Sequence, residues 1–394
     1  MNRLFSDRIS DVPRSFIREI LKVALEPGVI SFAGGLPNRD LFPLDAIANA
    51  TQQVFTKYGT DVLQYANSEG FGPLREAIAQ RYREKQGLDI SPDSILITSG
   101  SQQGLDLLGK IFINDGEDLI IEEPGYLGAI QAFSIYKPKY HPIPVSDCGM
   151  DVDLLKATLQ RAKPKLMYTV PNFQNPSGIS YNKQNREDIA EILSSTRTLL
   201  IEDDPYGDLR FSGERIKSFK HMIPVNTVLL GSFSKSVVPG FRLGWIVAPD
   251  EIMKKLLIAK QATDLHTSHF TQCIVYEFLQ RENLDDHIEK IKAVYGKQCQ
   301  AMIRAIGEHF PKDVYHTTPN GGMFLWAELP HGLSAMELFE LAVKDKVVFV
   351  PGNPFYVGTI RPGTMRLNFS CVDEKTITNG IGRLGEAIER LMDK

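Results

Sequence analysis

The 394-residue sequence has no long apolar run and few cysteines. No uninterrupted apolar stretch approaches the roughly 18 residues of a membrane-spanning helix, so we expect no transmembrane segment. The charged N-terminal octapeptide has no apolar core, so we also expect no signal peptide. The four cysteines are scattered and include no CxxC pair, which argues against a zinc site or a disulfide framework. A reducing cytoplasm is therefore the expected location.

An excess of positive charge is missing as well. The formal net charge is −4, which gives no reason to expect binding to nucleic acid or to an acidic membrane surface. Repeats, low-complexity tracts and long linkers are also lacking. With 43% hydrophobic and 23% charged residues, the chain has the composition of an ordinary globular protein. Its length predicts one large domain and a smaller one.

Short apolar runs alternate with helix-like stretches from about residue 94 to residue 250. The expected strands cover 95–97, 119–121, 165–170, 198–201, 228–230 and 243–247, and the expected helices cover 103–112, 128–136 and 186–193. Continuous apolar strands between helices indicate a mostly parallel sheet that is covered on both faces. The polar loops follow the carboxyl ends of these strands, where α/β sheets bind ligands.

The C-terminal third predicts a compact α+β unit. It contains a long helix over 286–310 with an apolar stripe, a helix over 335–343, a strand over 365–369 and a terminal helix from residue 376. We expect the N-terminal residues to join this unit. The predicted division is a large domain of residues 46–295 and a small domain of residues 1–45 and 296–394.

The segment around Lys235 carries the strongest chemical signal. Lys235 lies among serines and glycines after a strand-like run, and Arg242 follows seven positions later. A lysine in such a loop can form an imine with an aldehyde, while the hydroxyl of Ser232 and the guanidinium can hold a dianionic phosphate. These properties suit pyridoxal phosphate. The alternative is an ordinary surface lysine in a polar loop.

A second candidate phosphate site is the turn between an expected strand and helix at Ser99–Gly104. Free amide groups and the positive end of a helix dipole there favour an anion, although Ser101 and Gln102 also fit a simple helix start. The turn matches neither a Walker A loop nor GxGxxG, which disfavours nucleotide binding. After the next strand, Tyr126 can stack on a flat heterocycle or serve only as a turn residue.

Three later strands end in further polar side chains. Asn175 lies in a tight turn, where its amide can donate to a phenolic oxygen or merely shape the turn. Asp203 follows an apolar strand and can stabilise a protonated pyridine nitrogen, with magnesium binding as the competing interpretation. Arg366, in a late strand, can grip a carboxylate with two hydrogen bonds or lie on the surface.

Several segments together resemble one protein family. They are 32–38 (FAGGLPN), 63–65 (LQY), 98–103 (TSGSQQ), 231–235 (GSFSK) and 260–267 (KQATDLHT). The chain resembles the fold-type I, pyridoxal-phosphate-dependent aminotransferases of class I/II, and within them the 2-aminoadipate and kynurenine aminotransferase branch. The resemblance implies an α/β large domain with a mostly parallel central sheet and a small α+β domain.

The resemblance also implies a role for each matching residue. Lys235 matches the lysine that holds the cofactor and moves protons, and Asp203 matches the partner of the pyridine nitrogen. Asn175 and Tyr206 match the residues that bind the phenolic oxygen, and Tyr126 matches the stacking aromatic. The phosphate ligands correspond to Ser101, Gln102, Ser232 and Arg242, with Tyr65 provided by a neighbouring subunit, which implies a homodimer.

On the substrate side, Arg366 matches the arginine that binds the α-carboxylate, and Gly35 matches a glycine beside the substrate. Arg18 matches an arginine that some members use for a distal carboxylate, and Arg14 and Arg39 are alternatives. The implied reaction is a ping-pong transamination between an amino acid and a 2-oxo acid. The expected donors are 2-aminoadipate, glutamate, aromatic or branched-chain amino acids, and the expected acceptor is 2-oxoglutarate. No metal is expected.

Two other functions remain open from the sequence. The first is another reaction on the same scaffold, such as β-elimination or decarboxylation. The second is a transcription regulator with an aminotransferase-like effector domain, which would carry a winged-helix domain first. Only about 30 residues precede Gly34, so we expect no such domain.

Overall fold

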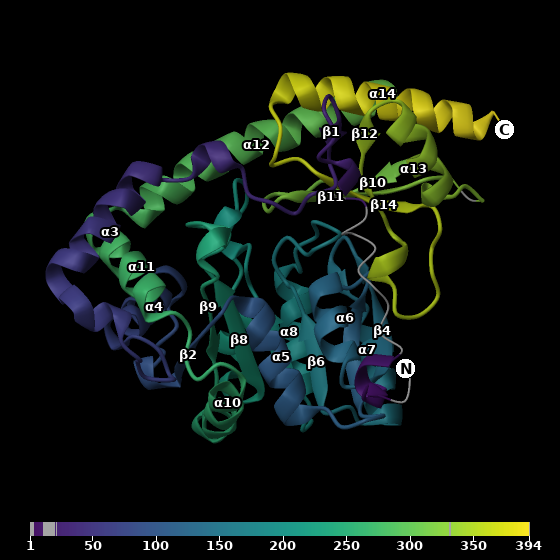
Figure 1. Cartoon of the computed structure of the whole chain (residues 1–394). Coiled ribbons are helices and arrows are strands. Elements are labelled where there is room, and N and C mark those ends of the chain that lie inside the picture. Colours follow the sequence, from purple (N-terminus) through teal and green to yellow (C-terminus); the bar gives the residue numbers. More distant parts are fainter. Residues whose placement is uncertain (1–3, 11–19, 21, 331, 394) are drawn as a thin grey trace.

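An eight-stranded sheet forms the centre of the computed structural model, which describes residues 4–10, 20, 22–330 and 332–393 (Figure 1). Its strands, in order across the sheet, are β2 (Ile95–Thr98), β9 (Gly244–Val247), β8 (Thr227–Ser232), β7 (Leu199–Asp203), β6 (Leu166–Thr169), β3 (Asp118–Glu123), β4 (Lys139–Ser146) and β5 (Gly149–Met150). The strands from β8 to β4 are parallel, whereas β2, β9 and β5 pair in antiparallel fashion. The predicted mostly parallel sheet is confirmed.

Helices cover both faces of this sheet, because both faces of each inner strand are apolar. Leu119 and Ile121 of β3 share a core with Leu105, whereas Ile120 between them shares a second core with Leu155. The helices of the large domain in the first core include α5 (Ser101–Phe112), α6 (Leu127–Ser134) and α10 (Asp250–Thr263), and the second core includes α7 (Val152–Ala162), α8 (Lys183–Ser194) and α9 (Phe219–Met222).

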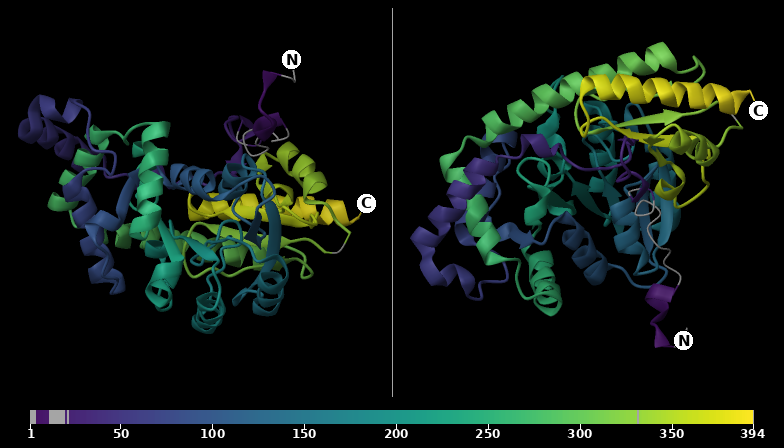
Figure 2. Two further views of the ribbon diagram at one scale, coloured as in Figure 1. Left: turned by 90° about the horizontal axis from the view of Figure 1, so that it is seen from below. Right: turned by 45° about the horizontal axis from the view of Figure 1, so that its top comes forward.

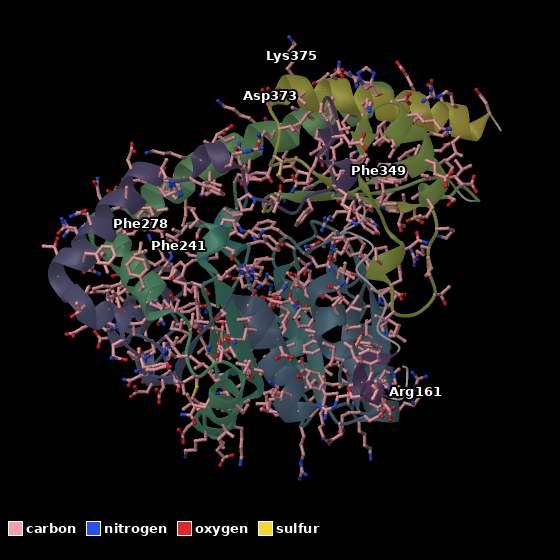
Figure 3. The ribbon with its side chains drawn as sticks, viewed as in Figure 1. Arg161, Phe241, Phe278, Phe349, Asp373 and Lys375 are labelled. Atoms are coloured by element: carbon pink, nitrogen blue, oxygen red, sulfur yellow. The ribbon has the colours of Figure 1, made fainter. Side chains whose placement is uncertain are left out.

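Three further helices pack against the β2 end of the sheet. They are α3 (Leu44–Tyr58), α4 (Gly72–Gln86) and α11 (His269–Arg281), and they share a third core with Ile95 and Ile97 of β2. Figure 3 labels Phe278 in this core and Phe349 in the C-terminal part, and both side chains are buried. The short helix α1 (Asp7–Ser10) lies near the N-terminus.

The C-terminal part is built on two small sheets. An antiparallel sheet contains β10 (Tyr315–His316), β11 (Phe324–Glu328), β14 (Thr364–Asn368) and β13 (Val350–Pro351), and a parallel pair joins β1 (Ile30–Ser31) to β12 (Val347–Val348). The helices of this part are α12 (Leu284–His309), α13 (Ala335–Lys344) and α14 (Glu374–Met392). The N-terminal strand β1 therefore pairs with a strand of the C-terminal part.

The long helix α12 connects the two parts. It runs from α3 and α11 to α14, along which it packs (Figures 1 and 2). The predicted apolar stripe is confirmed, since every member of it is buried: Ile288, Ile291, Tyr295, Cys299, Met302 and Ile306. The helix continues through residue 295 without a break, and the division at that residue stays a prediction.

The sequence did not predict strand β4. Pro142 and Pro144 lie within it, and proline is rare inside sheets because it cannot donate a ladder hydrogen bond. Here β4 lies second from the edge, between β3 and the two-residue strand β5, so most of its length pairs on one side only. Among the helices in the described part of the chain, none is both long and apolar enough to span a membrane.

Candidate active site

A cleft of about 430 Å³ opens at the carboxyl ends of β6, β7 and β8. Its walls come from the large sheet, from the N-terminal segment 35–37 and from β14. Eleven of the predicted site residues line it: Gly35, Ser101, Gln102, Tyr126, Asn175, Asp203, Tyr206, Ser232, Lys235, Arg242 and Arg366. The parallel strands explain this convergence, because their carboxyl ends meet at one edge of the sheet.

Lys235 lies three residues beyond the end of β8. Its Nζ donates to the carbonyl oxygen of Gly35 at 2.9 Å and lies 5.9 Å from the ring centroid of Tyr206. Burial lowers the pKa of Lys235 to about 8, and the nearby guanidinium groups of Arg366 and Arg242 act in the same direction. An appreciable fraction of this amine is therefore neutral near pH 7, as a nucleophilic lysine requires.

Asp203, the last residue of β7, is a buried carboxylate, and one of its two oxygens has no hydrogen-bond donor among the described residues. The Tyr168 hydroxyl donates to its Oδ2 at 2.8 Å, whereas Oδ1 accepts no hydrogen bond from the described residues. Burial, with a smaller contribution from the charges of Asp204 and Glu122, raises the pKa of Asp203 to about 7, although the Tyr168 hydrogen bond acts in the opposite direction. Because a buried acceptor is costly when unpaired, Oδ1 points to a ligand with an N–H or cationic group.

Arg366 is a buried guanidinium in the opposite wall. Its NH1 donates to Oδ1 of Asn175 and its NH2 to the carbonyl oxygen of Ala33, both at 2.8 Å, while its Nε has no partner among the described residues. The rings of Phe324 and Phe355 lie 4.4 and 5.4 Å from Cζ. Burial lowers the pKa of Arg366 to about 10. No ion pair joins it to a described carboxylate, so this cation is available for an anionic ligand.

Asn175 links this arginine to the floor of the cleft. Its Oδ1 accepts from Arg366, and its Nδ2 lies 3.4 Å from the Tyr206 hydroxyl. The Tyr206 ring packs edge-on against Phe324. Both polar groups are thereby held in fixed positions, with a hydroxyl and an amide directed at the same region.

The N-terminus of α5 also lines the cleft, through Ser101 and Gln102. Gly100 precedes the helix with φ +80°, and a Cβ at this position would lie 2.5 Å from NH2 of Arg242. Only glycine permits both this conformation and this close approach. Gln102 lies in the first turn and donates to the carbonyl oxygen of Gly128 at 2.7 Å. A helix N-terminus, a guanidinium and the hydroxyls of Ser101 and Ser232 together suit a dianion.

Of the predicted residues that the structure describes, Tyr65 lies outside the cleft of its own chain. It is 79% exposed and packs edge-on against His266, with ring centroids 5.9 Å apart. Arg18 and its alternative Arg14 lie outside the described residues. Arg39 is exposed in a short turn that follows the 35–37 segment.

Sequence reasoning missed several side chains around these groups. Tyr168 was predicted only as part of an apolar strand and Glu122 only as the residue that follows one, although both affect Asp203. Phe324, which contacts Arg366 and Tyr206, gave no signal either. Such contacts join residues that are distant in the chain, so no local pattern predicts them. Among the described residues, no group of three or more His, Cys, Asp or Glu is placed to hold a metal.

Comparison with known proteins identifies the family. The model of the aminotransferase class I and II family matches residues 27–384. Aromatic-amino-acid aminotransferase 1 of Thermococcus litoralis is 44% identical, over 100% of this chain and 95% of its own length.

Two solved structures are similar throughout. Kynurenine aminotransferase of Pyrococcus horikoshii, solved in complex with PMP, has a TM-score of 0.94 and 42% identity, covering 98% of this chain and 97% of its own. Alpha-aminoadipate aminotransferase of Thermus thermophilus, solved with N-(5'-phosphopyridoxyl)-L-leucine, has a TM-score of 0.93 and 38% identity, covering 99% and 98%. The chain belongs to the class I and II aminotransferases and is a fold-type I transaminase that depends on pyridoxal phosphate.

Proposed function

We propose that this transaminase moves the amino group of an L-amino acid to 2-oxoglutarate in a ping-pong reaction centred on Lys235. One observation supports this proposal above the others. A partly neutral lysine, a buried carboxylate with an unpaired oxygen and a buried arginine without an ion pair share one cleft. A cofactor aldehyde would react with the lysine, a cofactor ring nitrogen would pair with the carboxylate, and the carboxylate of an amino acid would pair with the arginine.

The residues of the cleft fit pyridoxal phosphate. The phosphate would be held by Ser101, Gln102, Ser232 and Arg242, around the Gly100 turn that a Cβ would fill. Asp203 would pair its free Oδ1 with the ring nitrogen, and Tyr126 would stack on the ring. The phenolic oxygen would be bound by Asn175 and Tyr206. When bound, pyridoxal phosphate supplies an aldehyde for amino groups and a ring that accepts electrons from the substrate Cα.

The chain's own residues position the substrate and move its proton. Arg366 binds the α-carboxylate through a guanidinium that two hydrogen bonds and two aromatic rings hold in place. Lys235 would hold the cofactor covalently and, once its amine is free, would take the substrate Cα proton, which its lowered pKa permits. Asp203, as a carboxylate, would keep the cofactor's ring nitrogen protonated. The same three residues act in reverse when the 2-oxo acid receives the amino group.

The substrate range is the least constrained part of the proposal. We propose an aromatic, branched-chain, 2-aminoadipate or glutamate donor, because similar enzymes are named for aromatic amino acids, kynurenine and aminoadipate. A distal carboxylate would need a cation near the cleft mouth. Arg39 is described and exposed beside the 35–37 segment, and Arg18 and Arg14 are the other candidates.

We further propose that the enzyme is a homodimer in which Tyr65 completes the partner's phosphate site. Tyr65 is exposed, as are Leu63 two residues before it and Leu265 next to His266, and helix α3 before it also exposes Leu44 and Phe55. Such a surface is typical of a subunit interface. A cytoplasmic location is also proposed; the four cysteines, all of which are described, are free thiols.

The first prediction concerns Lys235. Borohydride should fix the cofactor to this residue, and Lys235→Ala should abolish turnover while the protein still binds the cofactor. Lys220 provides a matched control, because burial also lowers its pKa to about 8, yet it does not line the cleft and bonds to the carbonyl oxygens of Pro224 and Thr227. Peptide mapping that found the label on Lys220, or on any lysine other than Lys235, would contradict the assignment.

The second prediction concerns Asp203. Asp203→Asn should fold and load cofactor but lose on the order of a hundredfold in kcat, a loss of about 2.7 kcal/mol in transition-state stabilisation. The reason is that a neutral amide cannot keep the ring nitrogen protonated. The control is Asp204→Asn, since Asp204 bonds to Asn172 and the Gly207 amide and does not line the cleft. Single-turnover kinetics showing equal rates for the two variants would refute this role.

The third prediction concerns substrate binding. A panel of amino donors with 2-oxoglutarate should yield glutamate, and Arg366→Ala should impair all donors alike, by roughly 2–5 kcal/mol in kcat/KM. Arg366→Lys should recover only part, because an ammonium cannot make the paired contacts of a guanidinium. Arg39→Ala provides a comparison: an effect confined to dicarboxylic donors would assign it the distal carboxylate. Release of ammonia or carbon dioxide in place of glutamate would favour a lyase or a decarboxylase.

The fourth prediction concerns assembly. The protein should sediment as a dimer or larger, and Tyr65→Phe should weaken cofactor retention by several-fold, because a phosphate hydrogen bond is lost. Dialysis followed by absorbance measures the retained cofactor, with wild-type protein treated in parallel. An active monomer that keeps its cofactor would rule out shared sites.

A further inference from the structure

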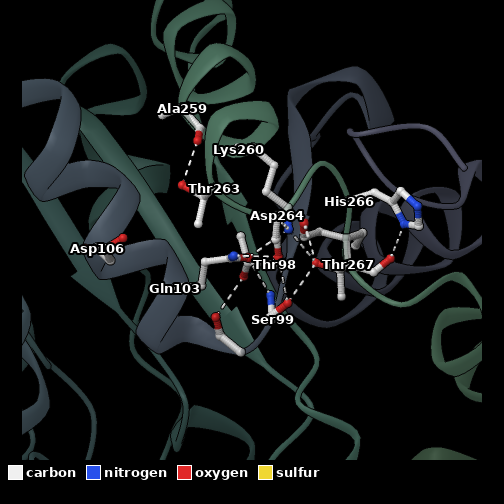
Figure 4. Close-up of polar contacts among 12 residues, drawn as sticks. Thr98, Ser99, Gln103, Asp106, Ala259, Lys260, Thr263, Asp264, His266 and Thr267 are labelled. Atoms are coloured by element: carbon white, nitrogen blue, oxygen red, sulfur yellow. Dashed lines mark hydrogen bonds and ion pairs between the residues drawn. The ribbon is translucent and has the colours of Figure 1, made fainter. Parts of the chain in front are cut away.

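The buried side chain of Lys260 lies outside the cleft and takes no part in the function proposed above. This residue of α10 is fully buried, and all three of its N–H donors are used. Nζ donates to Gln103 Oε1 at 2.9 Å, to Asp264 Oδ1 at 2.6 Å and to Thr267 Oγ1 at 2.9 Å (Figure 4). A buried cation that donates to three acceptors holds Gln103, Asp264 and Thr267 in fixed positions relative to one another.

On one side, this network fixes the turn that begins α5. The Ser99 amide donates to Gln103 Oε1 at 2.8 Å, on the same oxygen that Lys260 uses. The Ser99 hydroxyl lies 3.3 Å from Asp264 Oδ2 and 3.4 Å from Thr267 Oγ1 (Figure 4). Ser99 directly precedes Gly100 and Ser101, which form the proposed phosphate site of the same chain. The bonds to Lys260 therefore hold the residue that precedes this site.

On the other side, the network reaches the segment that carries Tyr65. The Thr267 carbonyl oxygen lies 2.9 Å from Nδ1 of His266 and accepts from Gln272 Nε2 at 3.0 Å. His266 Nε2 in turn accepts from the Ala66 amide at 3.3 Å, and its ring packs edge-on against Tyr65.

A second bond supports the same segment: Gln272, which is fully buried, accepts from the Phe71 amide at 2.7 Å. Leu265, in the loop between α10 and α11, has φ +67°, a conformation that residues other than glycine rarely adopt. A strained backbone conformation persists only where surrounding contacts hold it in place. Here Asp264 and Thr267, on either side of Leu265, both accept hydrogen bonds from Lys260.

We propose that Lys260 is a positioning residue that links the phosphate site of its own subunit to the Tyr65 segment that serves the partner's site. The inference rests on the proposed dimer, in which Tyr65 crosses to the neighbouring cleft. One side chain then aligns cofactor-binding elements of two active sites. Lys260 does not line the cleft, so its effect passes through Ser99 in one direction and through Thr267 and His266 in the other.

The test uses mixed dimers of two differently tagged chains. A reporter chain keeps Lys235, and a silent chain carries Lys235→Ala, so that the visible absorbance of covalently held cofactor arises only from the reporter's cleft. That cleft combines the reporter's own Ser99–Ser101 turn with Tyr65 of the silent chain. Titration of cofactor-free mixed dimers with pyridoxal phosphate then gives a dissociation constant for one cleft of known composition.

Lys260→Met is placed in each chain in turn. In the reporter it should raise the dissociation constant about tenfold, as is typical when a residue that orients a ligand-binding group is lost. In the silent chain it should also raise the constant, because the Tyr65 segment is displaced. An effect confined to the reporter, or no effect in either chain, would overturn the proposal.

A reference variant separates this inference from the shared site itself. Tyr65→Phe in the silent chain should weaken binding. If it does and Lys260→Met in the silent chain does not, the shared site stands and the link through Lys260 is wrong. If Tyr65→Phe has no effect, both the shared site and the link are overturned.

A second pair of variants covers the case in which Lys260→Met fails to fold. His266→Leu in the silent chain removes the acceptor for the Ala66 amide and leaves Lys260 and its three bonds unchanged. His266→Gln keeps an acceptor at a similar position and should restore most of the affinity. Equal dissociation constants for these two variants and the wild-type chain would also overturn the proposal.

Discussion

The cleft depends on one buried carboxylate that the protein leaves half satisfied. Asp203 receives a single hydrogen bond, from Tyr168, and its second oxygen has no partner among the described residues. Burial and the neighbouring charge of Asp204 raise its pKa to about 7, so the protein by itself leaves it only partly ionised near neutral pH. A ligand with a protonated nitrogen relieves this penalty, and the relief adds to its affinity.

The opposite wall presents the complementary case. Arg366 is a buried cation whose described partners are an amide oxygen and a carbonyl oxygen, not a carboxylate. Lys235 lines the same cleft, and burial lowers its pKa to about 8, so part of this amine is neutral near pH 7. The protein thus keeps an acid and a cation apart and unpaired, and each is available for a different part of the bound molecules. Placing them close enough to pair would remove both binding sites.

Much of this arrangement could be predicted from the sequence, because the cleft residues follow the ends of apolar strands. Asp203 comes at the end of β7, and Lys235 and Asn175 lie a few residues beyond β8 and β6, so the α/β pattern brings them to one edge. Prediction failed where local patterns mislead or carry no signal. Pro142 and Pro144 argued against a strand where β4 lies. No sequence spacing indicated that the Tyr168 hydroxyl would donate to Asp203. The role of Lys260 was equally hidden, since its partners Gln103 and Thr267 meet only in the folded chain.

The ionisation of Asp203 is the most direct measure of this account. Carbon-13 NMR of protein labelled at aspartate carboxyl groups, with Asp203→Asn to assign the signal, follows this carboxyl through a pH titration. In cofactor-free protein it should titrate near pH 7, with its proton lost as the pH rises through that value. With pyridoxal phosphate bound it should stay ionised to well below pH 7, because the ring nitrogen provides the missing cation. A carboxyl that titrates at the same pH with and without cofactor would contradict the central claim.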